Sequence, residues 1–327
     1  VTNIRAIGDK PELIGRLASV LIQALQKHGV AATAKHFPGD GMDDRDQHLA
    51  TTINHLPFKQ WQETFGRVWR QVIEAGVYTI MPGHISLPDY QGYRDNPEAA
   101  PPATLSRKLL ISLLREELGY EGLIVSDNAS MIGLTAHLDA EDRVVESIAS
   151  GIDIYLNADP EHDFDRLLQA VHSGRVSEDR VYDAARRVLE MKARLNLFAA
   201  PQYAPPSPAE QETFQSAAQT LADKSMTALS GAGNLKLDIA PGSHVLTITV
   251  GHLMPHMGIV DLEVFDNELS ARGFQVTHLL NPSSDELRQA AEEHVAVFVN
   301  MVKIPMMPLG TARITDTFRS WGWRSLF

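Results

Sequence analysis

Four short segments of the chain share one pattern, which restricts the fold to a parallel sheet with intervening helices. Each begins with glycine, continues as an apolar run and ends at a polar side chain. The segments are "GVAATAKH" (29–36), "GVYTIMPGH" (76–84), "GLIVSD" (122–127) and "GIDIYLN" (151–157). Short apolar runs bounded by glycine are typical of strands that are buried on both faces, as in parallel sheets. The pattern therefore predicts an α/β protein.

Amphipathic helical patterns separate these segments, over residues 11–29, 104–119 and 179–198. The apolar stripe of the first helix consists of Leu13, Leu17, Val20, Leu21 and Leu25. Strands that alternate with helices indicate βα units, and in (β/α)8 barrels the carboxyl ends of the strands form the active site. The chain has only about four clear units of this kind, whereas a barrel needs about eight. The pattern is therefore compatible with an open sheet or with a chain that begins partway through a barrel.

A proline-rich stretch, "AAPQYAPPSPAEQ", separates two parts of the chain and predicts a linker at residues 199–208. After it come a helical pattern at 212–229, strand patterns at 244–251, 274–280 and 295–302, and helical patterns around 261–272 and 284–293. We therefore expect one α/β domain over residues 1–198 and a second one over residues 209–327.

Composition excludes several classes of function. The net charge is -12 and no Lys/Arg cluster offsets it, so we expect no nucleic-acid partner. The chain has no cysteine, which excludes disulfides, thiolate metal sites and cysteine nucleophiles. No apolar run reaches the ~20 residues of a membrane helix, so we expect no membrane partner. The compartment stays open, with a cytoplasmic location favoured over a secreted one.

Two sets of residues could carry acid–base or nucleophilic chemistry. Asp127 ends the third apolar run, where a carboxylate costs desolvation free energy unless it is used. From position alone, capping of the following helix explains Asp127 equally well. Asp46 and His48 lie two residues apart in "KHFPGDGMDDRDQH" (35–48) and could form a proton-transfer dyad. A lone D-x-H is more often part of a solvated loop, so this motif alone decides nothing.

Other polar residues near the strand ends leave further alternatives. His84 could bind a polar substrate, or it could be a structural histidine bonded to a neighbouring loop. A metal site formed by His36, His48 and nearby aspartates is a weaker alternative, because the spacing fits no calcium loop and Lys35 would lie beside the ion. We therefore expect no metal and no cofactor.

Two motifs together resemble glycoside hydrolase family 3. The stretch "KHFPGDGMDDRDQH" resembles the family's K-H-F-P-G-x-G-x(4)-D-x-H motif, in the form typical of its β-N-acetylglucosaminidase branch. The stretch "GLIVSDNASM" resembles the segment that carries the nucleophile. The resemblance covers roughly residues 4–198 and is weaker over the second domain, which is similar to the family's α/β sandwich.

The resemblance implies a role for each matching residue. Asp127 would be the nucleophile, His48 the general acid/base, and Asp46 the partner of His48. The residues expected to contact the sugar are Arg5, Lys35, His36 and, from its place at a strand end, His84. Asp40 stands where many relatives have histidine and has no assigned role. Asp43 and Asp44 are expected to be solvated loop residues.

We therefore expect a retaining glycoside hydrolase that releases terminal β-linked N-acetylhexosamine (GlcNAc) from a carbohydrate substrate through a covalent glycosyl-enzyme. The alternatives are a β-glucosidase of the same family and a non-catalytic sugar-binding protein on the same fold; phosphate could also replace water as the acceptor. The resemblance implies the C-terminal part of a (β/α)8 TIM-type barrel, followed by a partial α/β sandwich. We expect such a fragment to be inactive alone, and its oligomeric state is not predicted.

Overall fold

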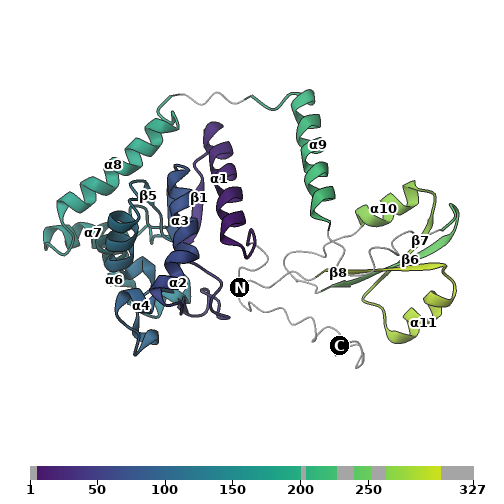
Figure 1. Ribbon diagram of the computed structural model, residues 1–327, viewed down its shortest axis with the longest axis horizontal. Coiled ribbons are helices and arrows are strands. Elements are labelled where there is room, and N and C mark those ends of the chain that lie inside the picture. Colours follow the sequence, from purple (N-terminus) through teal and green to yellow (C-terminus); the bar gives the residue numbers. More distant parts are fainter. Residues whose placement is uncertain (1–5, 200–203, 227–238, 252–262, 303–327) are drawn as a thin grey trace. The chain divides into compact units, whose positions relative to one another are not determined.

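The computed structural model describes residues 6–199, 204–226, 239–251 and 263–302 of the chain. It forms two compact units that are divided at residues 201–202 (Figure 1). The predicted domain limits of 1–198 and 209–327 lie on either side of this division and stay predictions. Both units combine helices with parallel strands, which confirms the predicted α/β class.

The first unit alternates strands with helices. Its first half contains α1 (Pro11–Lys27), β1 (Thr33–Phe37), β2 (Thr52–Ile53), α2 (Phe58–Glu63), α3 (Phe65–Glu74), β3 (Thr79–Pro82), β4 (Ile85–Ser86) and α4 (Pro88–Gln91). Its second half contains η2 (Pro97–Ala99), η3 (Ala103–Leu105), η4 (Lys108–Glu117), β5 (Leu123–Ile124), α5 (Ile132–Thr135), α6 (Ala140–Ser150), α7 (Asp163–His172) and α8 (Glu178–Arg194).

Three of the predicted strands form one parallel sheet in the order β1-β3-β5. Thr33 pairs with Thr79, which in turn pairs with Leu123. A second parallel pair, β2-β4, comes from the loops that follow β1 and β3. The carboxyl ends of the three main strands thus share one edge. Lys35 and His36 lie in the last residues of β1, whereas Asp46, His48, His84 and Asp127 follow the strand ends.

The fourth apolar run, at 151–157, forms no full strand. It contributes a single parallel bridge between Ile154 and Val125 of the segment that continues β5. The N–H of Ile124 faces this run, but the side chain of Asp153 accepts its hydrogen bond at 2.9 Å. The aspartate thus occupies a donor that a neighbouring strand would otherwise use. Main-chain pairing continues beyond it, where the N–H of Ser126 donates to Ile154 O at 2.9 Å.

Helix α1 confirms the predicted helix, but its buried face differs from the predicted apolar stripe. The helix packs against α3 through Gly15 and Ile22, and a Cβ on Gly15 would lie 1.6 Å from Oε1 of Gln71. Leu13 of the predicted stripe is half-buried, whereas Leu17, Val20, Leu21 and Leu25 are exposed, with Val20 at 60% and Leu21 at 56%. The absence of a side chain at Gly15 allows this close approach and explains which face is buried.

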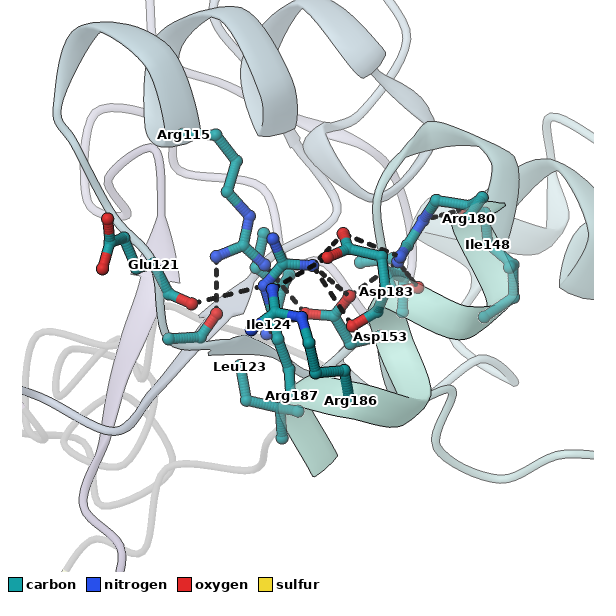
Figure 2. A network of polar contacts seen from close by, with 12 residues as sticks. Arg115, Glu121, Leu123, Ile124, Ile148, Asp153, Arg180, Asp183, Arg186 and Arg187 are labelled. Atoms are coloured by element: carbon teal, nitrogen blue, oxygen red, sulfur yellow. Dashed lines mark hydrogen bonds and ion pairs between the residues drawn. The ribbon is translucent and has the colours of Figure 1, made fainter. Parts of the chain in front are cut away.

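A fully buried carboxylate, Asp153, links β5 to the helices around it (Figure 2). Its Oδ2 accepts hydrogen bonds from Arg115 Nη2 at 2.8 Å and from the Ile124 N–H at 2.9 Å. Its Oδ1 accepts from Arg180 Nη2 at 2.7 Å and lies 3.7 Å from Arg187 Nη1. Since Arg115 belongs to η4 and the other two arginines to α8, one carboxylate joins both helices to the strand.

All three arginines also donate to main-chain carbonyls, Arg187 through Nε to Glu121 O at 3.3 Å. Arg115 Nη1 donates to Tyr120 O at 2.9 Å and to Gly122 O at 2.5 Å, at the start of β5. Burial lowers the pKa of Arg115 to about 10, against the opposing charge of Asp153. Arg180 Nη2 donates to Ile152 O at 2.6 Å, and its Nε donates to a carbonyl of α6. The network therefore fixes the backbone on both sides of the strand.

The second unit contains α9 (Pro208–Ser225), β6 (His244–Gly251), α10 (Glu263–Ala271), β7 (Gln275–Leu280), α11 (Ser284–Glu292) and β8 (Ala296–Val302). Its strands are parallel in the order β7-β6-β8, and Leu246, Ile248 and Val250 of β6 form the centre of its core. The predicted strands and helices of this region are confirmed to within a few residues, whereas residues 303–327 lie outside the described part. Among the described residues, no helix combines the length and apolarity that crossing a bilayer requires.

The Asp153 network generates a stability prediction. Asp153→Asn should lower the free energy of unfolding of the first unit by about 3 kcal/mol, because it removes the charge that neutralises buried arginines. Urea denaturation followed by circular dichroism measures this loss. Asp183→Asn is the matched control: Asp183 also pairs with Arg187 but is 39% exposed, so its loss should stay within about 1 kcal/mol. Equal losses for the two variants would contradict the prediction.

Candidate active site

The candidate site begins where β1 ends, and two tryptophans hold that end in place. Phe37 has no solvent exposure and packs edge-on against Trp61 and Trp69. The carbonyl of Pro38 accepts hydrogen bonds from both indole Nε1 groups, at 2.9 and 3.0 Å. Buried indoles need an acceptor, and one carbonyl here serves both. The backbone that carries Lys35 and His36 is thereby anchored.

Gly39 turns the chain from this anchor into the loop. Its φ of +143° lies in a region that favours glycine, and a Cβ would lie 2.2 Å from Cδ1 of Phe65. The buried side chain of Asn54 donates to Gly39 O at 3.2 Å. The glycine thus allows the sharp turn that brings residues 40–48 back over the strand ends.

His36 lies between two carboxylates. Its Nε2 is 3.3 Å from Asp127 Oδ2, and its Nδ1 is 3.4 Å from Asp40 Oδ2. Asp127 follows β5, and its Oδ1 accepts from the N–H of Asn128 at 2.7 Å. The alternative that Asp127 caps the next helix is wrong, because the residue before α5 is Met131 and no side chain caps it.

Asp46 and His48 form the predicted dyad. Asp46 Oδ1 lies 2.7 Å from His48 Nδ1 and accepts from the His48 main-chain N–H at 2.9 Å. The Asp46 side chain is only 4% exposed, whereas that of His48 is 34% exposed. Asp46 is therefore no solvated loop residue. Because the carboxylate holds Nδ1, the other ring nitrogen of His48, Nε2, is the atom that can exchange a proton.

The dyad loop is hydrogen-bonded to the segment that follows Asp127. The N–H of Ile132 donates to His48 O at 3.2 Å, and the N–H of Gly133 donates to Gln47 O at 3.0 Å. A Cβ on Gly133 would lie 2.7 Å from that same Gln47 carbonyl. Thr51 adds a side-chain hydrogen bond to Gly133 O at 2.9 Å. Two loops from distant parts of the sequence thus form one unit.

His84 is fully buried, and both of its ring nitrogens have partners. Nε2 donates to the carbonyl of Asn128 at 3.0 Å, and Nδ1 lies 3.0 Å from Thr104 Oγ1. Burial lowers the pKa of His84, which favours the neutral ring. This geometry supports the structural alternative for His84, since it holds the residue next to Asp127 and has no nitrogen free for a sugar.

Two further residues, Lys35 and Arg5, are predicted to contact the sugar. Lys35 lies in β1 opposite Met81 and is exposed, and its side chain has no hydrogen bond or ion pair with the described residues. Arg5 lies outside the described residues. Within the described ranges, no three histidine, aspartate or glutamate side chains converge in the manner of metal ligands.

Asp43 departs from its expected role as a solvated loop residue. Its side chain is only 7% exposed, and Oδ2 accepts from the Ile53 N–H at 2.8 Å and pairs with Arg45 Nη2 at 2.7 Å. Arg45 also pairs with Glu98 at 3.0 Å. Asp44 is exposed, as expected. Asp43 therefore anchors the loop that carries the dyad to β2.

The importance of Gln47 and Gly133 was missed by reasoning from the sequence. One signal existed for Gln47: it is the middle residue of the D-x-H motif, so it adjoins both dyad residues in the chain. For Gly133 a single sequence offers no signal, because its role depends on a carbonyl 86 positions earlier in the chain that only the fold brings close.

A family model, described as the glycosyl hydrolase family 3 N terminal domain, matches residues 2–191. Curated relatives are similar over this part of the chain. A "Beta-N-acetylglucosaminidase/beta-glucosidase" from Cellulomonas fimi is 38% identical over 203 residues, which are 60% of this chain and 36% of that protein. A "Beta-hexosaminidase" from Methylobacillus flagellatus is 35% identical over 164 residues, which are 50% of this chain and 45% of that protein. The chain thus spans less than half the length of either relative.

Solved structures resemble a larger part of the chain. A "Beta-glucoside phosphorylase BglX" has a TM-score of 0.81 and 27% identity, and the match covers 97% of this chain and 61% of that one. A glycoside hydrolase family 3 β-N-acetylglucosaminidase from Paenibacillus sp. str. FPU-7 has a TM-score of 0.77 and 27% identity. That match covers 90% of this chain and 58% of the other.

The anchoring of Asp43 generates a pH prediction. Burial alone would raise the pKa of Asp43, but hydrogen bonds from Arg45 and Ile53 lower it to about 2. A lowered folded-state pKa adds stability that is present above about pH 4 and is lost as pH falls toward the folded value. Asp43→Asn should therefore lower the free energy of unfolding by about 1 kcal/mol at pH 7 and by little near the folded pKa. Urea titrations from pH 7 to pH 2, with exposed Asp44→Asn as control, measure this; a deficit independent of pH would contradict it.

Proposed function

Since the chain belongs to glycosyl hydrolase family 3, we propose that it is the catalytic part of a retaining glycosidase that releases terminal β-linked GlcNAc. One observation carries this proposal. The 2.7 Å contact between Asp46 Oδ1 and His48 Nδ1 lies on a loop that is hydrogen-bonded to the segment after Asp127. A proton donor and a carboxylate nucleophile on two joined loops are the two groups that such an enzyme needs.

We also propose the finer architecture. The first unit is the C-terminal part of a (β/α)8 barrel, and the second is part of an α/β sandwich. The parallel order β1-β3-β5, with chemical groups after each strand, supports the barrel assignment. The parallel order β7-β6-β8 with intervening helices supports the sandwich. The limits 1–198 and 209–327 belong to the same proposal.

In the first step, Asp127 attacks the anomeric carbon through its carboxylate and forms a glycosyl-enzyme. His48, protonated on Nε2, donates that proton to the departing glycosidic oxygen. Asp46 holds Nδ1 of the ring and stabilises the imidazolium from which the proton leaves. Arg5, the exposed Lys35 and His36, which lies beside Asp127, bind sugar hydroxyls or the acetamido oxygen.

In the second step, neutral His48 takes a proton from water, which attacks the anomeric carbon and releases Asp127. An imidazole suits both steps, because it donates and accepts a proton near neutral pH. The names of the curated relatives support GlcNAc as the sugar, and the name of the Cellulomonas fimi protein supports β-glucosides as the alternative. The presence of Asp127 together with the dyad argues against a non-catalytic sugar-binding protein.

Phosphorolysis is a second candidate, supported by the similarity to the β-glucoside phosphorylase over 97% of the chain. In that reaction phosphate, in place of water, attacks the glycosyl-enzyme and leaves with the sugar on its oxygen. A neutral imidazole at position 48 repels an anionic acceptor less than a carboxylate base would. The same intermediate on Asp127 serves both reactions, so the product decides between them.

The substrate prediction concerns the natural full-length gene product. It should hydrolyse aryl β-GlcNAc faster than aryl β-glucoside at equal concentration, with free GlcNAc as the product. Release of aryl alcohol and phosphorus NMR in phosphate buffer measure both rates and the product. Preference for the glucoside would contradict GlcNAc as the proposed sugar. A sugar phosphate as the main product would show that the enzyme catalyses phosphorolysis and not hydrolysis.

The roles of Asp127 and His48 generate a second prediction for the same full-length protein. Asp127→Asn should reduce turnover on the order of 10⁴-fold or more with every substrate, because no glycosyl-enzyme forms. His48→Ala should cost roughly 10²–10⁴-fold with a poor leaving group, but little in the first step with a dinitrophenyl leaving group that needs no proton. Stopped-flow bursts separate the two steps. If both variants lose the same factor in turnover with both leaving groups, the roles assigned to Asp127 and His48 are wrong.

A further inference from the structure

Gln47, between the two dyad residues, is the side chain that the proposed mechanism leaves unused. It is buried, at 5% exposure, and both ends of its carboxamide are bonded. Nε2 donates to Asp40 Oδ2 at 3.0 Å, and Oε1 accepts from the main-chain N–H of His84 at 2.6 Å. Its main-chain carbonyl accepts from Gly133 at 3.0 Å. Gln47 therefore contacts the loops after three strands.

Asp40 continues this chain of contacts toward the nucleophile. Its Oδ2 lies 3.4 Å from His36 Nδ1, and the opposite nitrogen of that ring lies 3.3 Å from Asp127 Oδ2. Its Oδ1 accepts from the Gly41 N–H at 3.0 Å. Burial would raise the pKa of Asp40, but the hydrogen bond and charge of His36 outweigh it and the pKa is lowered. The carboxylate is thus ionised and oriented.

The space around Gln47 fits its carboxamide closely. A Cβ on Gly83 would lie 2.6 Å from Gln47 Oε1 and 2.9 Å from the Cβ of His36. The amide also has the required polarity, because it donates to a carboxylate at one end and accepts an N–H at the other. A glutamate of the same shape could accept from His84 but would bring a second carboxylate against Asp40.

We propose that Gln47 and Asp40 are positioning residues that hold the proton donor His48 in register with the nucleophile Asp127. This inference rests on the proposed function. Gln47 acts on the donor side, because its peptide group is shared with His48. Asp40 acts on the nucleophile side, through His36. A misplacement of about 1 Å between reacting groups can cost roughly 10²-fold in rate, which is the scale of the expected effect.

The test compares four variants of the natural full-length gene product: Gln47→Glu, Asp40→Asn, the double variant, and Asp44→Asn as the matched control from an exposed position of the same loop. Each is assayed with a phenyl and a dinitrophenyl leaving group. Gln47→Glu should lose roughly 10–10²-fold in kcat with the phenyl substrate and under about threefold in the first step with the dinitrophenyl substrate. Asp40→Asn should lower kcat with both substrates, because Asp40 acts on Asp127 through His36.

The double variant separates positioning from general damage. Asn at position 40 can donate to Glu at position 47, so the exchanged pair restores the hydrogen bond with reversed polarity. Its loss with the phenyl substrate should be at least about tenfold smaller than the product of the two single losses, and this recovery is a coupling that only interacting residues show. Thermal unfolding confirms that each variant is folded.

The outcomes are distinct. If the wild-type protein shows no glycosidase or phosphorylase activity, the proposed function fails and this inference fails with it. If the wild type is active and Gln47→Glu behaves like Asp44→Asn, only this inference is overturned. Equal losses of Gln47→Glu on both substrates, without recovery in the double variant, also overturn it. Leaving-group-dependent loss with recovery in the double variant supports it.

Discussion

The first unit depends on the neutralisation of one carboxylate that has no solvent exposure, Asp153. A buried charge of this kind is tolerated only when opposite charges and hydrogen bonds surround it. Arg115 and Arg180 meet this requirement, and each also donates to a main-chain carbonyl around β5, Arg115 to Gly122 O and Arg180 to Ile152 O. Two helices and one strand are thereby held at one point, and Asp127 follows three residues after the strand that this point fixes.

The opposite demands of stability and chemistry are met at different residues of the same strands. At β5, the buried charge of Asp153 fixes the backbone, and the residue proposed to react, Asp127, comes after the end of the strand. At β1 the anchor is aromatic, because Trp61 and Trp69 both donate to Pro38 O. His36 lies just before that anchor and reaches Asp127. Rigid strands thus present their polar ends at a common edge, which is where an active site on a parallel sheet is expected.

Local patterns in the sequence predicted the elements well and the contacts between distant residues poorly. The strands of the two three-stranded sheets and the helices 11–27 and 178–194 follow from periodicity and glycine boundaries, whereas the pair β2-β4 was not predicted. The fourth run became a single bridge because a side chain, Asp153, took a main-chain donor. The buried face of α1 was decided by Gly15, whose missing side chain matters only once α3 lies against it. Both causes are contacts between residues far apart in the sequence, so no local stretch of sequence reveals them.

The candidate site follows the same division. The hydrogen bond between Asp46 and His48 is local, so the spacing allowed it and the family resemblance selected it over a solvated loop. Asp40 stayed unexplained because Gln47 is held by loops that only the fold brings together. Once Gln47 is seen between Asp40 and His84, the acid at position 40 has a physical reason. A buried carboxylate requires donors, and the carboxamide and the imidazole supply them. The identities of positions 40 and 47 therefore constrain each other, since a change of charge at one leaves the other without its complement.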